Sequence, residues 1–142
     1  MLNTILEASE NFCIHQMHEK YTINNVISKK RTLIAYMDIE IKIAQKHRIY
    51  LALEKSFIQR LANLFLEEDE STEETLVDML LETLNLIAGS AKVIAQERDI
   101  NSFTISTPKF LKSGVFDINY DETKSLTIKD GDMIIAIKEL NG

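Results

Sequence analysis

The sequence has few of the residues that cross-link, break or bend a chain. Its 142 residues include one cysteine, one proline, four glycines and no tryptophan. The single cysteine, Cys13, cannot form an internal disulfide. So few prolines and glycines argue against long linkers and low-complexity tails. We therefore expect a single domain over residues 1–142, long enough to bury a real core.

Positive charge is also scarce. The chain has 16 Lys and Arg against 22 Asp and Glu, a formal net charge of -6. Binding to phosphate backbones needs a basic face, and the short basic run at 28–31 is too small to supply one, so we set nucleic-acid binding aside. No apolar run approaches the roughly 20 residues of a membrane helix. The start of the chain lacks the basic and apolar segments of a signal peptide. We expect a cytoplasmic protein.

Hydrophobic periodicity divides the chain into helices and strands, with the clearest alternation from Met37 to Ile43, where one face should be wet. One helix, then strands, then two helices and again strands predict an α+β fold, with long helices covering one face of an antiparallel sheet. The predicted helices span 2–19, 55–69 and about 72–97, and the predicted strands, with Gly114 as a break, span 21–28, 32–45, 47–54, 103–106, 114–120, 125–130 and 131–140.

The long helix begins after an acidic run and contains an unusual polar stripe. Ser71 and Glu74 have the spacing of a capping box, with Ser71 as the cap and Glu74 reaching back to it. At about 100° per residue, apolar side chains that include Leu86 and Val93 cover most of the helix, which predicts burial almost all round. The stripe that remains for water or a partner consists of Glu74, Asp78, Glu82, Asn85, Gly89, Lys92 and Gln96.

Two residues of this stripe are poor choices for a helix. The Asn85 amide competes for backbone hydrogen bonds, and Gly89 costs about 1 kcal/mol relative to alanine. Their position one turn apart suggests a site that another molecule approaches closely. The alternative is a surface asparagine beside a glycine that relieves helix packing. Lys92 is either a solvated lysine or a contact for an acidic partner.

The spacing of the stripe adds a second indication. Asp78 is followed by three residues and Glu82, then by two residues and Asn85, and then by 22 residues and Pro108. This spacing resembles the motif of the CheC/CheX/FliY chemotaxis phosphatases. The segments "NLIAG" and "STPKFLKSG" are similar to that family as well. The single motif looks most like CheX, because the first helix has Glu7 followed by Glu10 where two-motif members have a glutamate–asparagine pair.

The resemblance implies a CheX-like fold and hydrolysis of the aspartyl phosphate of a CheY-like response regulator. It implies catalytic roles for Glu82 and Asn85, in which the amide orients the attacking water and the carboxylate contacts a lysine of the partner. Asp78, Gly89 and Lys92 would contact the partner, and Pro108 would shape the backbone beside the helix. No cofactor or metal is expected in this chain, since Mg²⁺ would come with the receiver, and a homodimer is implied.

Two alternatives stay open, and a zinc site and a hydrolase triad are set aside. Many family members have glycine before the motif asparagine, whereas this chain has Leu84, which could narrow access to Asn85. A CheX-like adaptor that binds a receiver without catalysis is therefore a second hypothesis, and a chance match is a third. A zinc site at Cys13, His15 and His18 lacks a fourth ligand, and His47 has no nucleophile to complete a triad.

Overall fold

The computed structural model describes residues 1–42, 45–98, 103–129 and 131–140. Seven antiparallel strands form one sheet in the order β1-β6-β7-β3-β2-β4, and β5 pairs with β2 beside β4. The predicted hairpin of β2 and β3 lies within the sheet. Alternation is observed from Met37 to Glu40, where Met37 and Ile39 are buried and the polar residues between and after them are partly exposed; Ile43 lies outside the described residues. The strands are β1 (Thr22–Asn24), β2 (Arg31–Lys42), β3 (Gln45–Glu54), β4 (Thr104–Ile105), β5 (Lys109–Val115), β6 (Glu122–Ile128) and β7 (Gly131–Glu139).

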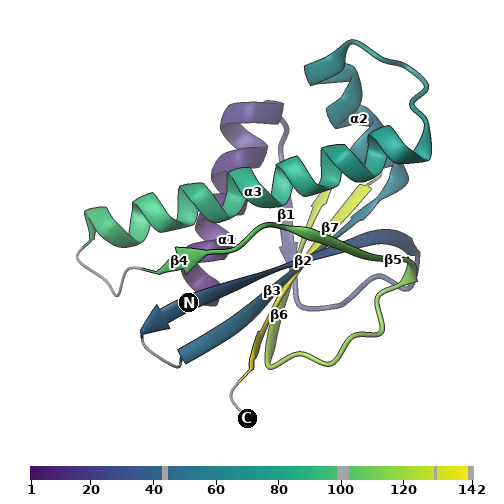
Figure 1. Ribbon diagram of the computed structural model, residues 1–142. Coiled ribbons are helices and arrows are strands. Elements are labelled where there is room, and N and C mark those ends of the chain that lie inside the picture. Colours follow the sequence, from purple (N-terminus) through teal and green to yellow (C-terminus); the bar gives the residue numbers. More distant parts are fainter. Residues whose placement is uncertain (43–44, 99–102, 130, 141–142) are drawn as a thin grey trace.

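The helices cover one face of this sheet, as the sequence predicted (Figure 1). The main core lies between the helices and the sheet. There, Leu33 and Leu51 of the sheet meet Ile5, Leu61 and Leu80 of the helices. A smaller cluster on the opposite face is centred on Tyr50 and Phe116. The helical segments are α1 (Leu2–Asn11), the π-helix η1 (Phe12–Met17), α2 (Lys55–Leu66) and α3 (Glu73–Glu97).

The predicted capping box is wrong. Thr72 is the N-cap of α3, and its hydroxyl accepts a hydrogen bond of 3.2 Å from the backbone N–H of Thr75. Ser71 is held elsewhere: its backbone N–H donates to Gln59 Oε1 at 2.9 Å, and its hydroxyl donates to Glu68 at 2.9 Å. Competing partners from α2 and the loop therefore move the start of the helix by one residue.

Two strand predictions need correction. The predicted strand over 114–120 is wrong, because β5 begins at Lys109, passes through Gly114 and ends at Val115. Phe116 then leaves the ladder and buries its ring in the cluster on the outer face of the sheet. The strand predicted over 21–28 is reduced to the three residues of β1.

Candidate functional site

The candidate site is on α3, the long helix that runs across the sheet between α1 and α2 (Figure 1). Thr83, Leu84 and Ala88 face the core, and the buried Thr83 hydroxyl donates to the Met79 carbonyl at 2.7 Å. Apolar packing on this side fixes how the helix is rotated about its own axis. The rotation presents the polar stripe on the opposite side.

The structure places the predicted motif residues together at the surface. Asp78, Glu82 and Asn85 are exposed, and Gly89 and Lys92 are partly buried on the same side. Residues three apart on a helix have Cβ atoms about 5–6 Å from each other, so the Glu82 carboxylate and the Asn85 amide can reach one group on a partner.

The functional groups of this stripe are free. Within the described residues, the side chains of Asp78, Glu82, Asn85 and Lys92 make no hydrogen bond or ion pair. An amide offers two donors and an acceptor without net charge, and a carboxylate offers acceptors only. The pair can therefore hold a water molecule and a cation of a partner at neighbouring points.

Gly89 is not required by packing within the described part of the chain. A Cβ atom added there would have no neighbour within 4 Å, and its φ is not positive. The interpretation that Gly89 relieves helix packing is therefore wrong. Gly89 lowers helix stability by about 1 kcal/mol relative to alanine, and no close packing among the described residues requires it.

Leu84 does not restrict access to Asn85. Its side chain is 1% exposed and belongs to the main core, whereas Asn85 is exposed. The expectation that Leu84 narrows the approach of a partner is wrong, because consecutive helical residues point about 100° apart. Leu84 acts in packing.

The prediction that α3 is buried almost all round is also wrong on one flank. Leu86 is 42% exposed, and Val93 is exposed as well. Leu86 separates two hollows along the helix. The first hollow, here called the acidic groove, has a volume of about 520 Å³ and is lined by Phe65, Leu66, Thr75, Asp78, Met79, Glu82 and Leu86.

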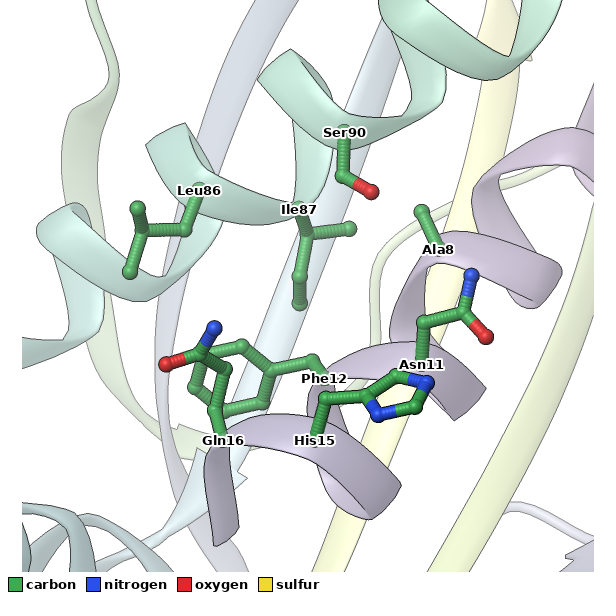
Figure 2. A pocket seen from close by; sticks show the side chains of 8 residues that line it. All are labelled: Ala8, Asn11, Phe12, His15, Gln16, Leu86, Ile87 and Ser90. Atoms are coloured by element: carbon green, nitrogen blue, oxygen red, sulfur yellow. The ribbon is translucent and has the colours of Figure 1, made fainter.

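The second hollow, of about 370 Å³, lies between α1, η1 and α3. Figure 2 shows Ile87 and Phe12 at its apolar centre, with polar side chains around them. Its described lining contains no carboxylate and does not include Glu82 or Asn85. The lining residues are Ala8, Asn11, Phe12, His15, Gln16, Leu86, Ile87 and Ser90. Sequence reasoning missed both hollows, since each depends on residues from separate helices.

Pro108 lies between β4 and β5, where the strand beside β2 is interrupted. Proline cannot donate to a sheet ladder and is found at edges and breaks of this kind. It is remote in sequence from the stripe, and its role in shaping the backbone beside the helix stays a prediction.

The residues considered for zinc do not converge. Cys13 is fully buried, whereas His15 and His18 are exposed. Burial raises the pKa of the Cys13 thiol to about 11, which disfavours the thiolate that a metal requires. Among the described residues, no three His, Cys, Asp or Glu side chains are grouped to hold a metal ion.

No described helix is long and apolar enough to cross a membrane.

Comparisons with known proteins bear on the family and the fold. The family model of the chemotaxis phosphatase CheX matches residues 34–129. The sequence matched none of the curated proteins with which it was compared. Among solved structures, a CheC-like superfamily protein from Shewanella sp. PV-4 has 17% sequence identity and a TM-score of 0.73, with 96% of each chain covered.

Two further structures are named as CheX proteins. The chemotaxis protein CheX from Vibrio vulnificus has 15% identity and a TM-score of 0.72, with 96% of this chain and 97% of that chain covered. The CheX–CheY–BeF₃–Mg²⁺ complex from Borrelia burgdorferi has 17% identity and a TM-score of 0.65, with 97% of each chain covered. At these identities the likeness establishes the fold.

Proposed function

The chain belongs to the CheX family of chemotaxis phosphatases, and we propose that it hydrolyses the aspartyl phosphate of a CheY-type response regulator. The observation that supports this most is the exposed pair of Glu82 and Asn85, which have no partner among the described residues and lie on a helix whose other side is buried. A CheX protein has been seen in complex with CheY, beryllofluoride and magnesium.

In the proposed reaction, the oxygen of a water molecule attacks phosphorus and the bond to the aspartyl oxygen breaks. Inorganic phosphate and a free aspartate result. Asn85 accepts from and donates to groups around the phosphoryl site, which lets it place the water in line without adding negative charge. Phosphoryl transfer depends mainly on such positioning and on charge neutralisation. The receiver supplies Mg²⁺, and this chain contributes no cofactor.

Glu82 has a different role in this proposal. Its carboxylate forms a charge-assisted contact with a lysine of the receiver and so fixes where Asn85 enters. Asp78 precedes it by one turn on the same stripe and extends the acidic contact. Gly89 and Lys92 lie on the other side of Asn85, where a Cβ-free turn allows close approach and the ammonium group meets an acidic edge of the partner.

The test is the decay of a phosphorylated receiver with the unmodified protein and with Asn85→Ala. We expect the substitution to reduce the catalysed rate on the order of 10²-fold, because the attacking water loses its position. Asn85 is exposed, and alanine favours helix, so the variant should remain folded. Gln96→Ala is the matched control, since it removes another exposed amide from the same stripe outside the motif.

The decay assay, together with a measurement of receiver binding, distinguishes a phosphatase from a CheX-like adaptor. If Asn85→Ala is as active as the unmodified chain, the proposed mechanism is wrong. Receiver binding without faster decay would select a CheX-like adaptor. That alternative depended on Leu84, which the structure places in the core.

We also propose a homodimer. Among the described strands, β5 pairs only with β2, so its other edge is open to a second copy. Phe110 and Val115 on this strand are exposed and could be covered by that copy.

A further inference from the structure

The acidic groove beside Glu82 joins exposed apolar side chains to carboxylates. The last turn of α2 exposes Leu64, Phe65 and Leu66 in succession, and Phe65 and Leu66 line the groove with Leu86 of α3. Single exposed apolar residues are normal on protein surfaces, but a contiguous group marks an interaction site. This group borders directly on a motif residue.

The wall of the groove formed by α2 is held in place by the loop that follows it. The Gln59 amide donates to the Glu68 carbonyl at 3.0 Å, and the Asn63 amide donates to the Asp69 carboxylate at 2.5 Å. Glu67 ends α2 with a φ of 57°, a left-handed conformation that costs a non-glycine residue about 1 kcal/mol or more. The loop thus adopts one defined path between α2 and α3, and the groove is preformed.

The charge of the groove limits what can occupy it. Among the described residues, its lining includes the carboxylates of Asp78 and Glu82 and no lysine or arginine. The exposed acids of the α2–α3 loop, residues 67–70, continue the negative charge from the end of α2. A partner must therefore present apolar side chains together with at least one cation to be complementary.

Area gives a second argument. A specific interface buries about 800 Å² on each partner, which two side chains such as Glu82 and Asn85 cannot supply. A receiver whose phosphoryl group meets Asn85 must also cover the surface next to it. Leu86 follows Asn85 in the chain and lines the groove together with Glu82.

We propose that the acidic groove seats the receiver domain through a patch of apolar side chains with a cation beside its phosphorylated aspartate, and that Phe65 and Leu66 are anchors of this contact. The inference rests on the proposed function, because it takes the receiver as the partner. It assigns binding of the partner to α2, an element outside the motif, and leaves the chemistry with Asn85.

The chain offers a closely matched pair of variants. Leu64 and Leu66 are two positions apart and are each 47% exposed, but of the two only Leu66 lines the groove. The probe is a CheY-type receiver loaded with Mg²⁺ and beryllofluoride, titrated against each variant. We expect Leu66→Ser to raise Kd about tenfold, as for a truncated interface anchor, and Leu64→Ser to change it less than about twofold.

The kinetic readout separates docking from chemistry. Leu66→Ser should raise KM and leave kcat unchanged at saturating phosphorylated receiver, because it removes binding that the ground state and the transition state share. Leu86→Ala, on the other wall of the groove, should behave in the same way. Thermal unfolding of each variant confirms that it is folded.

The outcomes distinguish this inference from the proposed function. Equal effects of Leu64→Ser and Leu66→Ser on Kd would overturn the proposal that the receiver binds in the groove. The Asn85→Ala result, which tests the proposed function, would still stand. If the chain binds the receiver without hydrolysing it, the proposed function fails, and the groove is judged by Kd alone. If Leu66→Ser changes the sedimentation of the protein alone but not receiver binding, the occupant is a second copy and the proposal is wrong. If the unmodified chain binds no receiver, both proposals are wrong.

Discussion

Leu84→Ala tests whether Leu84 packs the core or controls access to Asn85. The side chain is 1% exposed and lies in the main core with Leu80 and Ile87. Truncation of a buried leucine to alanine costs about 2–5 kcal/mol, and alanine adds no penalty of its own in a helix. For a domain of this size, a loss near 3 kcal/mol lowers Tm on the order of 10 °C. The variant should remain folded at low temperature, since the free energy of unfolding of natural domains is roughly 5–15 kcal/mol.

Leu86→Ala is the matched control for stability. It removes the same atoms two positions along the same helix, from a side chain that is 42% exposed. We expect a loss below about 1 kcal/mol, as for surface substitutions without special contacts. Urea unfolding of both variants gives the difference in free energy, provided that the slope with denaturant stays constant.

The activity of Leu84→Ala completes this test. At a low temperature where the variant is fully folded, we expect its kcat/KM for a phosphorylated receiver to stay within about twofold of the unmodified chain, since no group of the stripe changes. A several-fold rise in kcat/KM with little loss of stability would refute the reasoning. It would mean that Leu84 stands beside Asn85 at the surface and hinders the partner.

Two further predictions concern the N-cap of α3 and the buried thiol of η1. Thr72→Ala should lower the free energy of unfolding by about 1 kcal/mol through loss of the N-cap, whereas Glu74→Gln should change it by less than about 0.5 kcal/mol. A larger loss for Glu74→Gln would mean that the capping box forms after all. At about pH 8.5, Cys13 should react slowly with a thiol reagent in the native protein and rapidly in urea, because burial raises its pKa to about 11; fast native reaction would contradict that burial.

The sequence was sufficient for the features that depend on local periodicity. The 25 residues of α3 show a helical repeat long enough to be recognised, and β2 with β3 shows regular alternation. The direction of the stripe follows from the same repeat, because 100° per residue places Asp78, Glu82 and Asn85 on one side. These features are set by neighbours in the chain.

The errors occurred where distant residues decide. Gln59, 12 residues before Ser71, takes its backbone N–H, so Thr72 becomes the cap. The ring of Phe116 joins a cluster on the outer face and ends β5 earlier than the pattern implied. Side-chain spacing within one segment contains no information about such partners.

Leu86 shows the same limit at the candidate site. A helical wheel gives the direction of its side chain but not what lies in that direction. In the structure, a hollow lies on each side of Leu86, one formed with α2 and one with α1 and η1, so an apolar residue in the arc remains exposed. The groove beside Glu82 could therefore not be predicted from the sequence, although each of its residues was visible.

The two sides of α3 have opposite relations to stability. On the buried side, Leu84 and Ala88 are residues that any well-packed helix would select. On the stripe, Asn85 and Gly89 each lower helix stability, and neither gains a contact in the described protein that offsets the loss. Local choices that disagree with the fold concentrate at functional sites, because selection there acts on another molecule. This disagreement is independent of the motif spacing, and it indicates the same turn of the helix as the place where a partner binds.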